Sequence, residues 1–70
     1  MDNEKIFKER LKELRIEQNL SQGELAKLTN LNQSTITRYE TGERTPNMFG
    51  LIALANFFKV SIDYLVGLEN

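Results

Sequence analysis

Apolar residues recur along much of this chain at spacings of three and four, which is the period of an amphipathic helix. Phe7, Leu11 and Leu14 form one such stripe on a charged segment that spans residues 4 to about 18. A later segment, Met48–Phe58, is apolar almost throughout. The pattern predicts an all-α fold.

Short polar residues and glycines predict where five helices begin and end. Ser21 and Glu24 have the spacing of a capping box, in which each side chain binds the backbone amide of the other residue. The residues expected to cap other helix starts are Asn32, Asn47 and Ser61, and those expected at helix ends are Asn19, Asn30, Gly42 and Gly67. The predicted helices cover residues 4 to about 18, 22 to about 28, 33–41, 48 to about 58 and 62–66.

The second and third predicted helices are joined by the short link Thr29–Asn32, which contains the apolar Leu31. Two helices with such a link predict a helix-turn-helix. Ala26 is small enough to let their backbones approach. The core positions expected in the second and fourth helices are Leu25, Ala26, Leu28, Met48, Leu51, Ile52, Ala55 and Phe58.

The third predicted helix has two chemically different faces. Ile36 and Tyr39 point one way, and the opposite face carries hydrogen-bonding side chains, namely Gln33, Ser34, Thr37 and Arg38. Gln and Arg make two-point contacts with adenine and guanine edges in the major groove of DNA. This face predicts a DNA recognition helix; the alternative is an ordinary amphipathic helix with a solvated polar face. Thr35 either packs at the turn or reaches a thymine methyl group.

Length and composition narrow the function. The 70 residues predict one small domain, residues 1–70, and the sequence has neither Cys nor His. Disulfides and the usual zinc sites are therefore excluded, together with histidine-assisted nucleophilic catalysis. We expect no enzyme activity, no cofactor and no metal. Nothing resembles a signal peptide or a membrane span, so we expect no membrane partner and a cytoplasmic location.

The charge balance argues against a strong general affinity for nucleic acid. The net charge is −1, and both signs are mixed along the chain, with three basic and three acidic residues between positions 22 and 44. DNA affinity must then come from the local placement of a few cations rather than from a global field.

The sequence resembles the phage repressor/Cro-type (xenobiotic-response-element) helix-turn-helix family. The resemblance extends from about Phe7 to Val66 and rests on pieces that recur in order. These are Arg15, Leu20-Ser21-Gln22-Gly23-Glu24-Leu25-Ala26, Ile36, Tyr39-Glu40-Thr41-Gly42, Pro46 and Val60-Ser61-Ile62-Asp63-Tyr64-Leu65. It implies a compact five-helix, lambda-repressor-like domain whose helix-turn-helix unit covers about residues 22–41.

The resemblance also implies roles for individual residues. Arg15 and Glu40 are expected to form a structural ion pair. Base edges are assigned to Gln33, Ser34, Thr37 and Arg38, and backbone phosphates to Gln22, Asn32, Thr41, Arg44 and Lys27. Glu43 departs from the commoner basic residue, which leaves Arg44 as the better phosphate contact in that loop. Asn30 replaces the glycine usual in the turn without an expected change of fold.

The aromatic residues Phe49, Phe57 and Tyr64 are candidates for an exposed patch in the last two helices. Operators in this family are generally near-palindromic, so one interpretation is a homodimer formed through this patch; the alternative is that the aromatics close the edges of a small core. The favoured function is a sequence-specific regulator of transcription that binds double-stranded DNA, a dimeric repressor. The alternative is a protein-interaction module of the same fold, an antitoxin or anti-repressor.

Overall fold

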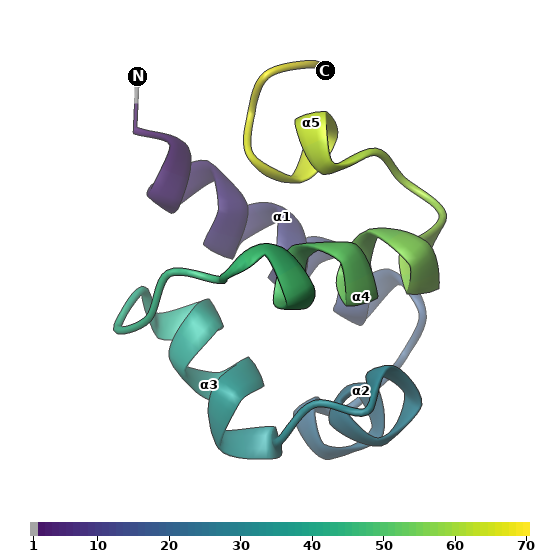
Figure 1. Cartoon of the computed structure of the whole chain (residues 1–70). Helices are drawn as coiled ribbons and strands as arrows, with labels where there is room; N and C mark the ends of the chain where they lie inside the picture. The colour runs from purple at the N-terminus through teal and green to yellow at the C-terminus, as the bar shows by residue number, and fades with distance from the viewer. Residues whose placement is uncertain (1) are drawn as a thin grey trace.

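Five helices and their short connections account for almost all of the chain in a computed structural model that describes residues 2–70 (Figure 1). The order is α1 (Asn3–Glu17), α2 (Gln22–Thr29), α3 (Gln33–Thr41), α4 (Met48–Phe58) and α5 (Ile62–Leu65). Residues 2–70 contain no strand. The predicted all-α class, the five helices and their bounds to within about two residues are confirmed.

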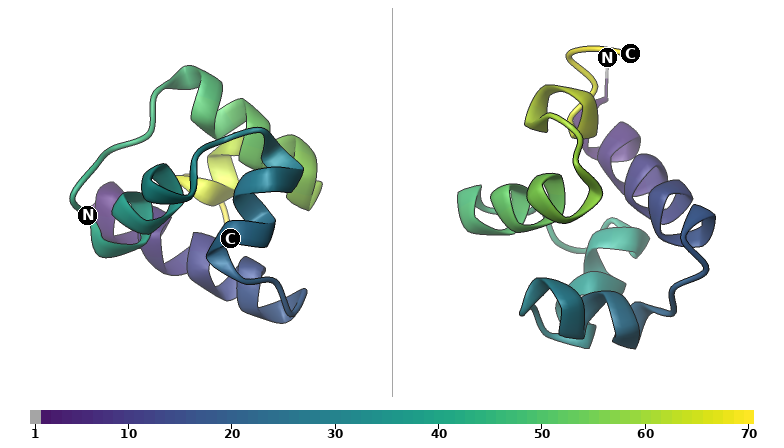
Figure 2. Two further views of the ribbon diagram at one scale, coloured as in Figure 1. Left: turned by 90° about the horizontal axis from the view of Figure 1, so that it is seen from below. Right: turned by 90° about the vertical axis from the view of Figure 1, so that its right-hand side faces the viewer.

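α2 and α3 pack against each other at one end of the molecule, and α1 starts at the opposite end beside α5 and the C-terminal segment (Figures 1 and 2). α4 crosses between these two ends (Figure 1). The principal extents are 30 × 24 × 21 Å. A helix-turn-helix held at one end by the other three helices can present α3 to a large partner.

The core contains one completely buried residue from each helix. The members with no exposed surface are Leu11 in α1, Leu25 in α2, Ile36 in α3, Leu54 in α4 and Leu65 in α5. Phe7 and Tyr39 meet edge to face beside them, with ring centroids 5.6 Å apart. Burying such side chains contributes about 1.5–3 kcal/mol each, so a 70-residue chain without crosslinks depends on this cluster.

Local chemistry forms the helix ends as predicted. The Ser21 hydroxyl accepts from the Glu24 N–H at 3.0 Å, and the Ser21 N–H donates to the Glu24 carboxylate at 2.8 Å. Asn47 and Ser61 accept from the N–H groups of Gly50 and Tyr64, which confirms both as caps. The residues with left-handed backbone at the predicted helix ends are Asn19, Asn30, Gly42 and Gly67.

Two local predictions, for Asn32 and Leu28, are wrong. Asn32 occupies the cap position of α3 with extended backbone, but its side chain makes no capping hydrogen bond. Lys59, directly after α4, caps the end of that helix in the left-handed conformation at φ 57°. Leu28 is 58% exposed, because only Leu25 and Ala26 of α2 face the core.

The predicted inward face of α4 is only partly correct. Ala55 and Phe58 are buried and Leu51 packs against the core, but Met48 and Ile52 are 66% and 40% exposed. Leu54, which was not assigned to the core, is completely buried. A helix that is apolar on nearly every side carries no polar face to fix its rotation, so the sequence pattern leaves its orientation open.

Candidate nucleic-acid interface

α3 exposes one polar face and buries the other. Gln33, Ser34 and Arg38 are exposed and Thr37 is half-buried, whereas Ile36 and Tyr39 lie in the core. The same four polar residues and Glu43 line one open depression in the surface. The residues that the sequence assigned to base edges therefore share one surface.

Thr35 belongs to the buried side of α3. It is 8% exposed, so it packs at the turn and does not reach outward. Its hydroxyl lies 3.5 Å from the Arg44 guanidinium, at the limit of a hydrogen bond. This geometry selects packing from the two alternatives for Thr35.

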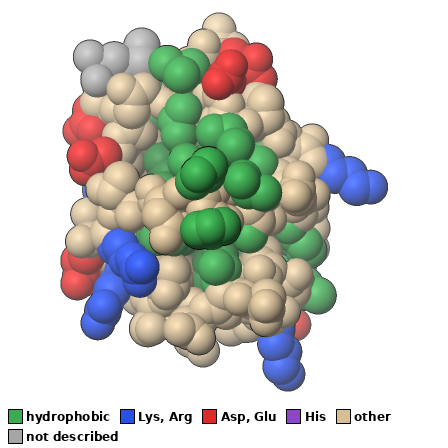
Figure 3. Space-filling model, in the orientation of Figure 1, with side chains coloured by type: hydrophobic (Ala, Val, Ile, Leu, Met, Phe, Trp, Pro, Cys, Tyr) green, Lys and Arg blue, Asp and Glu red, His purple; other side chains and the backbone are tan. Residues whose placement is uncertain are grey.

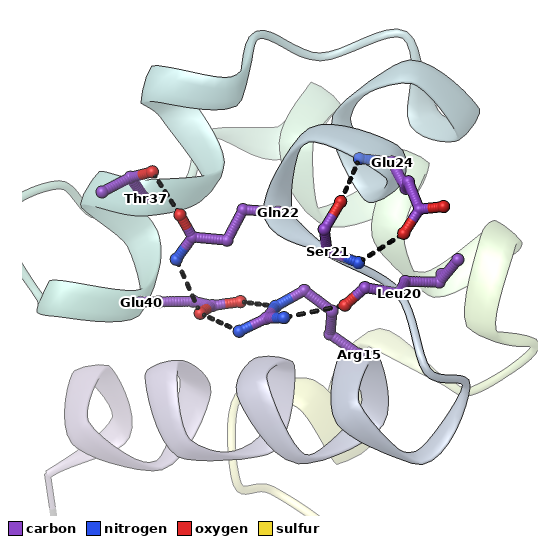
Figure 4. A network of polar contacts seen from close by, with 7 residues as sticks. All are labelled: Arg15, Leu20, Ser21, Gln22, Glu24, Thr37 and Glu40. Carbon is purple, nitrogen blue, oxygen red and sulfur yellow. Dashed lines mark hydrogen bonds and ion pairs between the residues drawn. The ribbon is translucent and has the colours of Figure 1, made fainter.

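Gln22 connects α2 to α3 through its side-chain amide (Figure 4). Its Oε1 accepts from the Thr37 hydroxyl at 2.7 Å, and its Nε2 donates to Glu40 Oε1 at 3.1 Å. The sequence placed Gln22 at a phosphate, and reasoning from sequence missed both of these contacts. Because Nε2 carries two hydrogens, one N–H remains for an external acceptor.

Arg15 joins α1 to the same network (Figure 4). Its Nε and Nη2 donate to the two oxygens of the Glu40 carboxylate at 2.7 and 2.9 Å, and its Nη1 donates to the Leu20 carbonyl at 2.8 Å. The side chains of Arg15 and Glu40 are only 13% and 4% exposed. The hydrogen bond to Glu40 raises the pKa of the Arg15 guanidinium, against the opposing effect of burial.

A short run of hydrogen bonds thus extends from the first helix to the exposed face of α3. Such two-point arginine–carboxylate pairs fix orientation even where their net contribution to stability is small. Across residues 2–70, every buried side-chain nitrogen or oxygen has a hydrogen-bond partner. The network is complete, so it holds α3 in one position relative to α1 and α2.

The residues assigned to phosphates lie around the α3 face rather than on it. Asn32 is exposed just before α3, Lys27 is exposed in the last turn of α2, and Arg44 is exposed in the loop after α3. The Thr41 hydroxyl lies 3.1 Å from both the Arg38 carbonyl and the Glu43 carboxylate. Glu43 also lines the depression, so its carboxylate places a negative charge there.

The three candidate dimer aromatics do not form one patch. Phe49 is 77% exposed, but Phe57 is half-buried and meets Phe58 edge to face with centroids 5.0 Å apart. Tyr64 is half-buried beneath the Arg10 guanidinium, 4.3 Å from its ring. Arg10 also donates to the carbonyls of Tyr64 and Glu69.

Apolar residues other than the three aromatics are also exposed in this part of the chain. Figure 3 shows hydrophobic side chains gathered in the middle of one face, over α4. The exposed large apolar residues of α4, α5 and the C-terminal segment are Met48, Phe49, Ile52, Ile62 and Leu68.

Two further geometric findings concern other kinds of site. Among residues 2–70, no helix is long and apolar enough to cross a bilayer. In the same range, no group of three or more His, Cys, Asp or Glu side chains is placed to hold a metal ion.

A capped helix, a link with a left-handed asparagine and a second helix with an exposed polar face together define a helix-turn-helix domain. The helix-turn-helix family model matches residues 11–65. The chain belongs to this family, in its phage repressor/Cro-type branch.

Named relatives agree with the assignment. The chain is 38% identical over 63 residues to the HTH-type transcriptional activator BcrR of Enterococcus faecalis, covering 90% of this chain and 31% of BcrR. It is 38% identical over 58 residues to the HTH-type transcriptional regulator ImmR of Bacillus subtilis, covering 83% of this chain and 46% of ImmR. The chain thus spans 31% to 46% of the length of these relatives.

The fold is similar to that of a repressor solved on DNA. A crystal structure of the P22 c2 repressor in complex with a synthetic operator superposes with a TM-score of 0.84 and 28% sequence identity. The match covers 91% of this chain and 97% of that one.

Proposed function

We propose that this chain is a sequence-specific regulator of transcription that binds double-stranded DNA through α3. The observation that carries the proposal is the convergence of Gln33, Ser34, Thr37 and Arg38 on one exposed face. An α-helix fits the major groove, and these side-chain types match the donors and acceptors on base edges there. The solved complex of the similar P22 c2 repressor with its operator supports the same partner.

Phosphate contacts on either side of α3 would fix its register in the groove. Lys27 and Arg44 supply the cations, and Asn32, Thr41 and the free N–H of Gln22 supply uncharged hydrogen-bonding groups. With a net charge of −1, the chain has no global attraction for DNA, so these few local contacts must provide the electrostatic part of binding.

The second part of the proposal is a homodimer on a near-palindromic operator. A twofold assembly presents two α3 helices to two half-sites one helical turn apart. The exposed apolar residues of α4 and α5, of which Phe49 is the most exposed, are the surface that a second copy would cover. The proposed effect is repression by occupancy, without catalysis or cofactor, in the cytoplasm where the target DNA lies.

A protein-interaction module is the second candidate function. Two observations favour it: the net charge of −1 and the exposure of Phe49, which is 77% accessible. In this case a partner protein, not a second copy, would cover the exposed apolar residues of α4, as in an antitoxin or anti-repressor.

One experiment separates the two functions. Duplex DNA is selected from a random pool with the purified protein, and the affinity of the enriched site is then measured over a range of salt concentrations. We expect enrichment of a near-palindromic site, with log affinity falling steeply against log salt concentration. A pool that never enriches would favour the interaction module. Transcription from a promoter that carries the site then shows whether binding represses, which matters because BcrR is named an activator.

A further inference from the structure

A chain of hydrogen bonds runs from Arg15 through Glu40 and Gln22 to Thr37, and the ion pair determines which group donates in each bond. The Glu40 carboxylate accepts from Arg15 at both oxygens, at 2.7 and 2.9 Å. A carboxylate beside a guanidinium has no hydrogen to give, so the group that Gln22 turns toward it at 3.1 Å must be the donor, Nε2. The orientation of the Gln22 amide follows from this requirement.

The orientation of Gln22 then determines what Thr37 can do. With Nε2 turned toward Glu40, the amide oxygen Oε1 faces the Thr37 hydroxyl at 2.7 Å. An amide oxygen only accepts, so Thr37 donates its single hydrogen inward. The lone pairs that remain on the Thr37 oxygen are the only hydrogen-bonding capacity that it can offer to a partner outside the protein.

We propose that Thr37 acts as an acceptor-only reader of the DNA base edge, with Gln22 as the residue that fixes this polarity. The inference rests on the proposed function and adds the chemistry of the base. In the major groove, adenine N6 and cytosine N4 carry amino donors, whereas guanine O6 and N7 and thymine O4 are acceptors. Thr37 therefore selects adenine or cytosine at the position that it faces, and it disfavours guanine, thymine and phosphate oxygens.

Ser34 shows that the constraint belongs to Thr37 and not to hydroxyl groups in general. Ser34 lies on the same face of α3, and within residues 2–70 its hydroxyl takes part in no hydrogen bond. It can turn to donate or to accept, so it tolerates either kind of base edge. The hydroxyl groups of Ser34 and Thr37 are chemically alike, but only that of Thr37 is hydrogen-bonded to Gln22, so the two differ in the base edges that they select.

The test compares base preferences of selected sites for the wild type, Thr37→Val and Gln22→Met. Thr37→Val keeps the shape but removes the oxygen, so the position whose preference changes identifies the base that Thr37 faces. There, we expect the wild type to favour adenine or cytosine over thymine or guanine by roughly fivefold, the factor that one hydrogen bond provides. Gln22→Met frees the hydroxyl to donate, and we expect the preference to fall to roughly twofold or less.

Controls separate this effect from general damage to the protein. Gln18→Met makes the same chemical change at the exposed position just after α1, and we expect it to leave affinity and base preference unchanged. In a Thr37→Val background, Gln22→Met should no longer alter the preference at that position. If Gln22 acted only on phosphate, its replacement would weaken binding to all sites equally, which would overturn the proposal.

A second measurement needs no DNA. In NMR spectra of the free protein, we expect the Thr37 hydroxyl proton to exchange slowly with water, and Gln22→Met to make it exchange too fast to observe. If the Thr37 hydroxyl proton exchanged equally fast in both proteins, the claim that Gln22 fixes the direction of its hydrogen bond would be wrong. If the wild type selects thymine or guanine at the Thr37 position, this inference fails while the regulator function stands. A wild-type pool without any enriched site contradicts the regulator function itself.

Discussion

At the scale of single residues, the site depends on a nearly buried charge pair. Arg15 and Glu40 are 13% and 4% exposed, and two hydrogen bonds join the guanidinium to the two carboxylate oxygens. Such a pair adds little net stability, but the loss of one partner leaves the other buried without compensation. The pair therefore matters more for the position of α3 than for the total free energy of folding.

Glu40→Ala tests this role. It leaves the Arg15 guanidinium unpaired and frees Nε2 of Gln22, so we expect a loss of about 3 kcal/mol in the free energy of unfolding. Thermal melts monitored by circular dichroism measure the loss, and DNA affinity should fall with it. Glu17→Ala, at the exposed end of α1, is the control and should change neither. Unchanged stability in Glu40→Ala would show that the ion pair does not have the structural role described.

Gly50 illustrates a different constraint, which is close approach. A Cβ atom at this position would lie 2.4 Å from the hydroxyl oxygen of Tyr39, whose ring is buried and cannot move aside. We expect Gly50→Ala to destabilise the protein by about 1–3 kcal/mol through overpacking, partly offset by the helix preference of alanine of about 1 kcal/mol.

Tyr39→Phe supplies the matched background for the same measurement. Without the hydroxyl, the nearest ring atom to a Cβ at position 50 is Cζ, at 3.3 Å. Gly50→Ala should then lower the free energy of unfolding much less than it does in the wild-type background. Urea denaturation measures both changes. An equal cost in both backgrounds would show that the hydroxyl is not the obstacle.

At the scale of the helices, local signals fixed the ends more reliably than the faces. Capping by Ser21, Asn47 and Ser61 depends on residues within one turn, so the sequence alone predicts it. The rotation of α4 and the pairing of Gln22 with Thr37 depend on how helices lie against one another. Spacing along the chain carries no such information, which is why the contacts of Gln22 with Thr37 and Glu40 could not be predicted from it.

The capping box of α2 makes stability depend on pH. The Ser21 backbone N–H, and then its hydroxyl, lower the pKa of Glu24 below its ordinary value of 4.5. A carboxylate with a lowered folded-state pKa contributes stability above the ordinary pKa and loses it as the pH falls through the folded value. We expect the melting temperature of Glu24→Gln, which keeps capping geometry, to fall less than that of the wild type below pH 4.5. Parallel pH curves for the two proteins would contradict this.

Substitutions on the polar face of α3 and substitutions beside it should affect DNA binding in different ways. Arg38→Ala removes a side chain from the polar face, so we expect a loss of about 1–3 kcal/mol confined to sites with the preferred base. Arg44→Ala removes a cation beside that face, so binding to all sequences should weaken and the slope of log affinity against log salt should fall by about one. Affinity titrations on preferred and altered sites measure both effects. If Arg38→Ala lowered the affinity for all sequences equally, Arg38 would contact a phosphate and not a base.

At the scale of the whole molecule, the polar and apolar surfaces lie on different parts. The hydrophobic side chains gather over α4, whereas the end formed by α2 and α3 is mostly polar (Figures 1 and 3). The proposed DNA-binding surface and the proposed dimer surface are therefore separate. The net charge of −1 makes both depend on local contacts rather than on long-range attraction.

The most direct test of the central claim is amide chemical-shift mapping by NMR while the selected duplex is titrated into the labelled protein. We predict the largest shifts in α3 and its flanks, at Gln33, Ser34, Thr37, Arg38 and Arg44, with small shifts at Ile52 on the apolar patch. Shifts concentrated on Met48, Phe49 and Ile52, with α3 unaffected, would contradict the assignment of α3 as the DNA-binding surface.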